Sequence, residues 1–475
     1  MKKIRFFLAI IVGKTIFFLT RTLGRGGGTA APGLIANKLY PPLASQVTNQ
    51  LKYGSVVITG TNGKTTTSRI LSSILCQAGY KPIHNRAGSN LMRGVTSTLI
   101  EKCTLGGKIK ANIGIWEIDE ATFPHAVKDL NPKIVIITNL FRDQLDRYGE
   151  IDTIKKIWEE SLLKLSRETV VILCGDDPNV ASLGLNLKNK VFYFGIEDKS
   201  FVTKTLPHSA DCKQCPRCGS FLSFSSCFFS HLSSQYTCTN CGFSRPPIDL
   251  ICRKILFKDT KSTQVSLNTL TKQLNLKIYL SGLYNVYNLL AAVATAQVLK
   301  VTENEIEEGV LKFRPAFGRI EKISAGKKEI LLLLCKNPTG FNEVLRTITR
   351  KKKKLNILIA INDCVADGRD VSWLWDVDFE VLREKTQSLI VSGVRAEDMA
   401  LRLKYAGLEI GNWYAQGISR SKQLEIEKSF QRAITLGLKR TKAKEALYIL
   451  PTYTAMLEIR KVLNKMGLTH KSWED

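Results

Sequence analysis

The chain has 475 residues, of which 69 are Lys or Arg and 42 are Asp or Glu, so its formal charge is +27. The hydrophobic fraction of 44% is enough for buried cores and excludes a wholly disordered chain. The length suggests about three domains. The charge is uneven, because residues 1–100 contain thirteen Lys or Arg and no acidic residue. This excess predicts an anionic partner: a nucleic acid, a phosphate-bearing ligand or an acidic membrane surface.

The N-terminal residues begin like a signal peptide, with basic residues before an apolar run, but Lys14 interrupts the run and no small-residue cleavage site follows. The run is also too short for a spanning helix, which needs about 20 apolar residues. Instead, the spacing of Ile4, Leu8, Ile11 and Phe18 predicts an amphipathic helix. We favour packing of this helix on the protein over contact with a membrane. We expect a cytoplasmic chain, with a peripheral position at the inner face of the cell membrane as the alternative.

Residues 55–67 predict a buried strand, a glycine-rich loop and the start of a helix. The loop reads Thr-Gly-Thr-Asn-Gly-Lys-Thr at residues 59–65. Its N–H groups and the helix N-terminus can hold a triphosphate, Lys64 can reach the β- and γ-phosphates, and Thr65 can bind Mg²⁺. The candidate ATP-binding residues of this segment are Thr59, Gly60, Thr61, Asn62, Gly63, Lys64, Thr65 and Thr66.

A second strand is predicted over residues 113–118, and Glu117, Asp119 and Glu120 lie at its carboxyl end. In an open α/β sheet, ligands bind outside the carboxyl ends of the strands, so these acidic residues are expected near the phosphate loop. A carboxylate there can hold Mg²⁺ beside the γ-phosphate. A solvated acidic strand end is the alternative.

Two Cys-x-x-Cys pairs, Cys215 with Cys218 and Cys238 with Cys241, are each followed by glycine. Four thiolates on two such turns predict a tetrahedral Zn²⁺ site of the zinc-ribbon type. Cys212 offers an alternative partner for Cys215, but we prefer Cys218 because a glycine follows it. The site is expected to be structural, since four thiolates leave no open position for a water molecule.

The C-terminal part of the chain alternates predicted strands and helices, which indicates a small doubly wound α/β domain. After the strand predicted at residues 355–361, a loop carries Asp363, Asp367 and Asp370. Loops at strand ends commonly carry functional residues. An Asp-Gly turn stabilised by its own side chains is the alternative for this segment.

The loop at residues 59–65 resembles the ATP-binding loop of the Mur ligases, the amino-acid-adding enzymes of bacterial cell-wall synthesis. Two further segments, residues 138–149 and 282–292, match that family in the same order. A narrower resemblance, to the MurT branch of synthetase subunits, rests on residues 24–33, 85–90, 315–319 and 336–343. The MurT branch also has the Cys-Pro-x-Cys-Gly form found here from Cys215 onward. The resemblance extends from about residue 8 to residue 465.

The resemblance implies a Mur ligase-like central P-loop domain with a parallel-rich sheet, an inserted four-cysteine zinc ribbon and a smaller doubly wound C-terminal α/β domain. We expect an N-terminal helical segment, a central ATP-binding domain with the ribbon inserted in it, and the C-terminal domain. The N-terminal segment is expected at residues 1–50, the central domain at 51–320, the ribbon at 205–255 and the C-terminal domain at 321–475.

The resemblance also implies roles for individual residues. Glu117 is the first choice and Glu120 the second for Mg²⁺, while Asn285 and Asn288 belong to the stretch that contacts adenine. Where many Mur ligases have a histidine metal ligand, this chain has Gln144, which argues against a second metal there. The neighbouring charged residues, which are either functional or structural, are Asp143, Asp146 and Arg147.

The implied reaction is ATP-dependent amidation, through an acyl phosphate, of the D-glutamate α-carboxyl of lipid II to D-isoglutamine. Ammonia would come from a GatD-like glutamine amidotransferase, since none of the five histidines lies in a recognisable Cys–His nucleophile motif. By the same resemblance, Asp370, then Asp367, then Asp363 is the choice for the aspartate that faces this glutaminase and completes its Cys–His machinery. The implied cofactors are ATP, Mg²⁺ and Zn²⁺.

Two other functions fit parts of the sequence. A Mur or folylpolyglutamate-type ligase would add an amino acid instead of ammonia, but the ribbon and the aspartate-rich loop argue against it. A nucleic-acid-binding NTPase would fit the charge, but no recognition module is present and the ribbon has few basic residues. We therefore expect no nucleic-acid partner.

Overall fold

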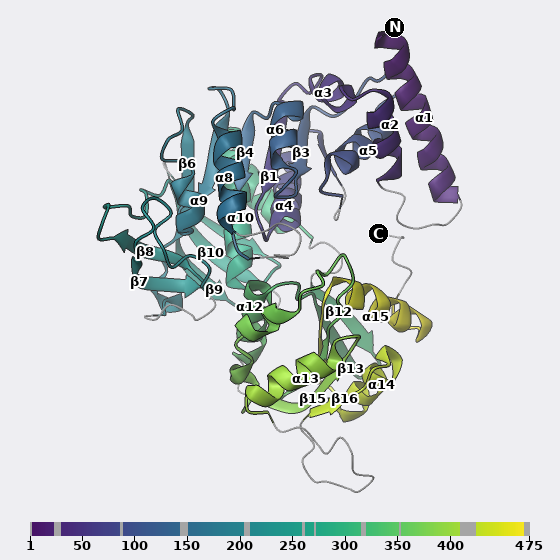
Figure 1. The fold of residues 1–475 in the computed structure, drawn as a ribbon, viewed down its shortest axis with the longest axis vertical. Coiled ribbons are helices and arrows are strands. Elements are labelled where there is room, and N and C mark those ends of the chain that lie inside the picture. The colour runs from purple at the N-terminus through teal and green to yellow at the C-terminus, as the bar shows by residue number, and fades with distance from the viewer. Residues whose placement is uncertain are drawn as a thin grey trace, which may run out of the picture. The chain divides into compact units, whose positions relative to one another are not determined.

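The fold is that of a computed structural model, which describes residues 2–22, 30–85, 89–142, 151–203, 210–258, 262–269, 272–314, 320–350, 353–408 and 424–469. The chain divides into two compact units (Figure 1). The first unit takes residues 1–141 and 150–314, and the second takes residues 142–149 and 315–475.

The first unit is built on a nine-stranded sheet of order β11-β10-β9-β6-β5-β4-β1-β3-β2. Seven neighbouring strands of this sheet run parallel: β9, β6, β5, β4, β1, β3 and β2. At the other edge, β10 pairs antiparallel with β9, and β11 pairs antiparallel with β10. Every residue of β1, β3 and β4 is buried, as expected for parallel strands covered on both faces. The strands are β1 (Ser55–Thr59), β2 (Pro82–His84), β3 (Ile113–Glu117), β4 (Ile134–Ile137), β5 (Val170–Cys174), β6 (Val191–Ile196), β9 (Leu250–Phe257), β10 (Thr263–Asn268) and β11 (Gln273–Ile278).

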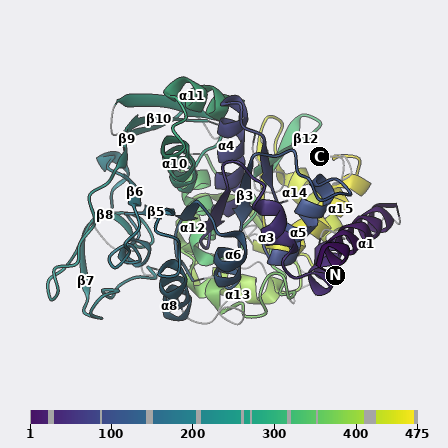
Figure 2. The ribbon, with the colours of Figure 1, turned by 90° about the horizontal axis from the view of Figure 1, so that it is seen from above.

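Helices cover both faces of this sheet. Figure 2 shows α4, α10 and α11 on one face and α6 and α8 on the other. In the sheet, β1 lies between β3 and β4. The chain therefore leaves β1 toward β2 on one side and leaves β4 toward β5 on the other, which makes this the topological switch point of the sheet. The helices of the unit that follow the first strand are α4 (Lys64–Gln77), α5 (Met92–Lys102), α6 (Phe123–Leu130), α8 (Ile151–Leu162), α9 (Pro178–Ser182), α10 (Leu283–Val298) and α11 (Glu303–Lys312), with the short 3-10 helix η1 (Lys199–Phe201).

The N-terminal residues form α1 (Lys2–Thr22), α2 (Ala31–Leu39) and α3 (Leu43–Thr48), and α1 packs on α2 and α5. The face of α1 that packs on the protein carries Phe6, Ala9 and Ile10, which are all buried. The packing face therefore differs from the apolar face expected from the sequence, whose four residues are exposed: Ile4, Leu8, Ile11 and Phe18. None of the helices in the described ranges has the length and apolar character to cross a bilayer.

The cysteine-rich insertion forms a separate antiparallel hairpin of β7 (Leu222–Phe229) and β8 (Leu232–Cys238). Its small core combines Cys215, Cys238, Tyr236 and Phe243. The following strand β9 pairs with β6 and β10 in the central sheet. Residues 250–255, which we expected within the insertion, are thus part of the central sheet.

The second unit has a six-stranded sheet of order β12-β13-β17-β14-β15-β16, parallel except for the β12–β13 hairpin. Alternate residues of β14 enter different cores: Ile357 and Ile359 face one cluster, while Leu358 and Ala360 face another. This two-sided burial is that of a doubly wound domain. The elements are β12 (Ile320–Ala325), β13 (Lys328–Leu333), α12 (Pro338–Thr349), β14 (Leu355–Ala360), η2 (Ser372–Asp376), η3 (Phe379–Leu382), β15 (Thr386–Ser392), α13 (Ala396–Tyr405), β16 (Leu424–Ile426), α14 (Phe430–Arg440), β17 (Ala446–Pro451) and α15 (Tyr453–Lys465).

Candidate functional site

The loop between β1 and α4 depends on two glycines with positive φ. Gly60 has a φ of +129° and Gly63, which directly precedes α4, has a φ of +89°. A Cβ at Gly63 would lie 1.9 Å from Asn288 Oδ1, so both the backbone conformation and the space require glycine. The first turn of α4 contains no acidic residue, which leaves its N-terminus suited to an anion.

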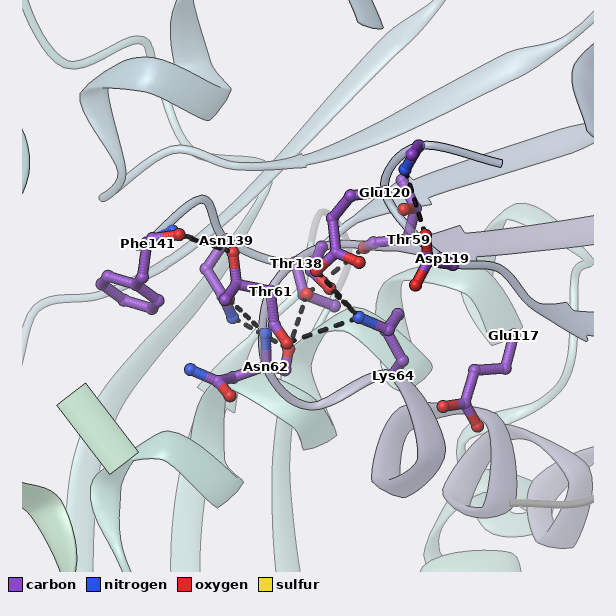
Figure 3. A network of polar contacts seen from close by, with 12 residues as sticks. Thr59, Thr61, Asn62, Lys64, Glu117, Asp119, Glu120, Thr138, Asn139 and Phe141 are labelled. Atoms are coloured by element: carbon purple, nitrogen blue, oxygen red, sulfur yellow. Dashed lines mark hydrogen bonds and ion pairs between the residues drawn. The ribbon is translucent and has the colours of Figure 1, made fainter. Parts of the chain in front are cut away.

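The strand end after β4 fixes the outer side of this loop. The Thr138 hydroxyl donates a 2.8 Å hydrogen bond to the Asn62 carbonyl oxygen, and the Asn62 N–H donates one of 2.8 Å to Asn139 Oδ1. The Phe141 N–H donates a 2.9 Å hydrogen bond to Thr61 Oγ1 (Figure 3). Individual roles for Thr138, Asn139 and Phe141 were not predicted from the sequence. The signal that could have indicated them is the polar pair Thr138 and Asn139, which directly follows a buried strand.

Lys64 and Thr65 each contact one of the predicted acidic residues. Lys64 Nζ lies 3.0 Å from Glu120 Oε1 and also donates to the Gly60 carbonyl oxygen. The Thr65 hydroxyl is 2.8 Å from both Glu117 carboxylate oxygens. All four side chains are buried. Glu117 is the last residue of β3 and Glu120 lies in the segment after it, and Figure 3 shows Glu120 beside Lys64. The parallel pairing of Ile58 with Glu117 produces this juxtaposition.

Two neighbouring polar residues hold the acidic segment in place. The Asn85 side chain accepts a 2.8 Å hydrogen bond from the Glu117 N–H and donates one of 2.8 Å to the Glu117 carbonyl oxygen. Asp119 is buried and its Oδ1 accepts the Ala121 N–H at 3.2 Å, so this carboxylate stabilises the turn before α6. Asp119 is therefore engaged in local structure, while Glu117 and Glu120 point to the loop.

Of the two predicted asparagines of α10, Asn288 lies against the loop and Asn285 is hydrogen-bonded to it. Asn288 touches Gly63 and donates a 3.2 Å hydrogen bond to Asn285 Oδ1. Asn285 in turn donates a 2.7 Å hydrogen bond to the Ser281 carbonyl oxygen. Two remaining candidates of the loop, Thr59 and Thr66, are buried, and the Thr59 hydroxyl has no hydrogen-bond partner among the described residues.

The four predicted cysteine ligands come together in the insertion. Their Sγ atoms all lie within 4.8 Å of one another. The Cys215–Cys241 Sγ distance is 3.6 Å and the Cys218–Cys238 distance is 3.5 Å. Thiolates bound to one Zn²⁺ at about 2.3 Å have similar separations, so the four residues fit a tetrahedral zinc ion. Cys212 is outside this group: it is buried, and its thiol donates to the Gln214 carbonyl oxygen.

A buried polar network, which sequence reasoning missed, joins the insertion to the central sheet. Asp176 Oδ1 accepts a 2.8 Å hydrogen bond from Arg245 Nε, and its Oδ2 accepts one of 2.7 Å from the Tyr287 hydroxyl. Burial raises the pKa of Asp176, although the charge of Arg245 opposes this shift. Next to it, His231 Nε2 lies 3.1 Å from Asp177 Oδ1. Both aspartates follow β5 directly, at the carboxyl edge that also carries the phosphate loop.

The three aspartates of the second unit have different environments. Asp363 forms a 2.8 Å ion pair with Arg395. Asp367 is buried and accepts hydrogen bonds from the Thr454 N–H and hydroxyl at the start of α15, and burial raises its pKa. Asp370 is exposed and accepts two 2.8 Å hydrogen bonds from Ser372. Asp370 is thus the exposed member of the three.

Several residues singled out by the sequence lie outside the described residues. They are Asp143, Gln144, Asp146 and Arg147, together with residues 24–29, 86–88 and 315–319.

Comparisons with known proteins agree with this arrangement. The family model of the Mur ligase middle domain matches residues 58–241, and that of the MurT ligase C-terminal matches residues 334–456. The MurT subunit of the glutamine-hydrolysing lipid II isoglutaminyl synthase of Streptococcus pneumoniae is 32% identical, over 98% of both chains. The subunit of the same name from Staphylococcus aureus is 31% identical, over 96% of this chain and 97% of its own.

Solved structures share the fold. A pseudomurein peptide ligase type C from Methanothermus fervidus has a TM-score of 0.64 and 25% identity, over 88% of this chain and 79% of its own. The MurF ligase of Thermotoga maritima in complex with ADP has a TM-score of 0.62 and 13% identity, over 93% of this chain and 84% of its own. With near-complete relatives above 30% identity, the chain belongs to the MurT family of lipid II isoglutaminyl synthase subunits, within the Mur ligase fold.

Proposed function

We propose that this chain is the synthetase subunit that amidates the D-glutamate α-carboxyl of lipid II to D-isoglutamine with the use of ATP. The observation that carries the proposal is the buried arrangement of Lys64, Thr65, Glu117 and Glu120 at a left-handed glycine loop. It occurs in a chain that is 32% identical to a MurT subunit over nearly its whole length. The second candidate is a ligase that adds an amino acid. The UDP-N-acetylmuramate–L-alanine ligase of Caldicellulosiruptor saccharolyticus is 24% identical to this chain, over 74% of this chain and 67% of its own.

The residues of the loop fit MgATP. The glycine conformations and the α4 N-terminus offer N–H groups to phosphate oxygens, and Lys64 supplies a positive charge beside them. Thr65 and Glu117 offer a hydroxyl and a carboxylate, the oxygen ligands that Mg²⁺ prefers. Mg²⁺ would neutralise charge that develops on the transferred phosphoryl group. These residues thereby position the γ-phosphate for attack rather than react themselves.

The proposed reaction has two steps. A substrate carboxylate oxygen bonds to the γ-phosphorus of ATP, the bond to the bridging oxygen breaks and ADP leaves. Ammonia then attacks the carbonyl carbon of the acyl phosphate, the C–N bond forms, and phosphate and a proton leave. Lys64 acts mainly in the first step, because its charge lies at the phosphate loop and Glu120 keeps its ammonium in place.

Ammonia is proposed to come from a GatD-like glutamine amidotransferase that binds the second unit. The 362–370 loop carries the exposed Val365, and the exposed Val394 donates its N–H to Asn362 at the start of the loop. Trp375 and Tyr405 are exposed as well. Trp375 and Tyr405 pack edge to face, and an apolar patch of this kind indicates a protein interface. Asp370 is exposed in the same region and is our choice for the aspartate that completes the partner's Cys–His machinery.

The four cysteines of the insertion are proposed to hold a structural Zn²⁺. Their compact Sγ arrangement supports this assignment, and a four-thiolate site leaves no coordination position for substrate. The proposed working place of the complex is the cytoplasmic face of the membrane, because lipid II is a membrane-bound substrate.

The experiment that tests the function is mass spectrometry of lipid II after incubation with this chain, its glutaminase, ATP and glutamine. We expect conversion of one carboxyl group to a carboxamide, and a Lys64→Met complex should give none while it still assembles. Hydrolysis of ATP and glutamine without amidation would contradict the proposal. A mass gain equal to an amino-acid residue would instead support the amino-acid ligase.

A further inference from the structure

Helix α1 has two apolar faces, and only one of them is used by the fold. The buried face carries Phe6, Ala9, Ile10 and Gly13. Gly13 permits close contact with α5, because a Cβ there would lie 2.8 Å from Ile100 Cδ1. Figure 1 shows α1 at the edge of the first unit with α2 and α5 on one side of it, and Figure 2 shows α5 on one side of α1.

The other face of α1 is an exposed apolar stripe, which the exposed Thr15 interrupts between Ile11 and Phe18. Ile4 is 72% exposed and Phe18 is 66% exposed, near opposite ends of the helix. The residues of the stripe repeat at the three- and four-residue spacing that places side chains on one side of a helix. The exposed apolar residues of α1 are Ile4, Phe7, Leu8, Ile11, Phe18 and Leu19. An elongated patch of this kind is unusual for a surface that only meets water.

The charge around the stripe indicates what it contacts. Lys2, Lys3 and Arg5 are exposed at the N-terminal end of the helix. The sequence contains no acidic residue before Glu101. A second copy of the chain would bring the same cations together without an acidic side chain on α1 to pair with them. An anionic bilayer instead offers phosphates to the cations and acyl chains to the stripe.

We propose that α1 lies in the headgroup layer of an anionic membrane, with its exposed stripe inserted between the lipids and its terminal cations on lipid phosphates. The helix has 21 residues, about 30 Å of length, and lies in the membrane plane rather than across it. The role of this surface rests on the proposed function, because the surface would hold the enzyme where a lipid-linked substrate is found.

The test is co-sedimentation of the full-length chain with vesicles of phosphatidylcholine alone or mixed equally with phosphatidylglycerol. The stripe variant carries Ile4→Ser, Ile11→Ser and Phe18→Ser, and the matched control carries Leu163→Ser, Leu185→Ser and Phe221→Ser. The control residues are comparably exposed, at 64%, 53% and 75%, but lie elsewhere on the first unit. Because all six side chains are at the surface, both variants should fold normally.

We expect the wild-type and control chains to bind the anionic vesicles, and the stripe variant to bind them at least about tenfold more weakly. A chain with Lys2→Glu and Lys3→Glu should also bind anionic vesicles more weakly than the wild type. A Phe18→Trp chain should show a blue shift of its emission on these vesicles. Equal binding of the stripe variant and the wild type would overturn the proposal, as would concentration-dependent dimerisation that the stripe variant abolishes.

A second measurement separates this proposal from the proposed function. Amidation of a lipid-free stem peptide by the complex should be the same for the wild-type and stripe-variant chains. Loss of vesicle binding with this activity intact supports the membrane role of α1. A chain that binds anionic vesicles through the stripe but amidates neither substrate would leave the docking surface standing and refute the amidation.

Discussion

His231 Nε2 lies 3.1 Å from Asp177 Oδ1, and both side chains are fully buried. His231 occupies the turn of the β7–β8 hairpin, while Asp177 caps α9 through the Asn179 and Val180 N–H groups. The other oxygen of Asp177 accepts a 2.8 Å hydrogen bond from the Leu140 N–H, next to the residue that holds Thr61 of the phosphate loop. The insertion with the four cysteines is therefore linked to the phosphate loop through one buried ion pair.

The first prediction concerns the pH dependence of stability. Burial lowers the pKa of His231, but the charge and hydrogen bond of Asp177, with a contribution from Asp211, outweigh burial and raise it. A pKa that is higher in the folded chain stabilises the fold below the unfolded value, about 6.5, and this contribution is lost as the pH rises through the folded value. The free energy of unfolding should thus fall with rising pH above about 6.5.

A His231→Gln chain should lose this slope and should be less stable by about 3 kcal/mol at pH 6, since it leaves Asp177 buried without its ion-pair partner. Urea unfolding at several pH values measures both effects. His125 is exposed, so His125→Gln is the control and should keep the wild-type profile. An unchanged pH slope in His231→Gln would refute the charged state of this histidine.

The second prediction concerns the metal. Cys218→Ser should remove zinc from the purified chain and loosen the hairpin that carries His231, because binding of structural zinc contributes to folding. Cys212→Ala should keep the metal, since Cys212 lies outside the four-thiol group. Elemental analysis measures the metal content. Calorimetry of ATP binding measures whether the loosened hairpin affects the phosphate loop. Retained zinc in Cys218→Ser together with loss in Cys212→Ala would reverse our ligand assignment.

Parts of the fold were predictable because they rest on local signals. The all-buried strands β1, β3 and β4 read as short apolar runs, and the glycines of residues 59–65 mark the turn into α4. The face on which α1 packs was not predictable. Both faces of that helix are apolar, and what decides between them is the close approach that Gly13 allows to Ile100.

The site was predictable to the extent that its residues follow strand ends in the sequence. The parallel pairing of β1 with β3 brings Glu117 to Thr65. The meeting of the two strand ends at one edge of the sheet was predicted from the open α/β fold, but the register was not. The contacts of Asp176 and Asp177 were missed because their partners, Tyr287 and His231, are distant in sequence. A single histidine or tyrosine carries no spacing signal, so only the folded chain reveals such pairs.

The third prediction compares two glycines with similar backbone angles. Gly63 and Gly79 have φ values of +89° and +77°, but only at Gly63 would a Cβ collide with a neighbour, Asn288. Alanine should cost about 1 kcal/mol of stability at either position through backbone strain. Gly63→Ala should cost about 1–3 kcal/mol more and weaken ATP binding, because Asn288 must move. Equal effects of the two substitutions on ATP affinity would show that the Gly63–Asn288 contact is unimportant.

The fourth prediction concerns Mg²⁺. The Thr65 hydroxyl and the Glu117 carboxylate are 2.8 Å apart. Thr65→Val should raise the Mg²⁺ concentration needed for half-maximal ATP hydrolysis by about 10–100-fold, whereas Thr65→Ser retains the hydroxyl and should stay near wild type. Glu117→Gln should act in the same direction as Thr65→Val. A Thr65→Val complex with an unchanged Mg²⁺ dependence would exclude this hydroxyl as a ligand.

The fifth prediction separates the three aspartates of the second unit. Asp370→Ala should lower glutamine hydrolysis by the complex about 100-fold or more if this exposed carboxylate orients the partner's histidine. It should leave ATP binding and thermal stability unchanged, because Asp370 is bonded only locally, to Ser372, in the contacts described above. Glutamate release by the reconstituted complex is the measurement.

The matched variants of this test are Asp363→Ala and Asp367→Ala. Asp363→Ala removes a partly exposed ion pair with Arg395 and should change little. Asp367→Ala should lower stability by about 1 kcal/mol, because the carboxylate accepts the Thr454 N–H at the start of α15. If Asp370→Ala hydrolyses glutamine normally and Asp363→Ala does not, the residue that serves the glutaminase is Asp363, and its pairing with Arg395 must open when the partner binds.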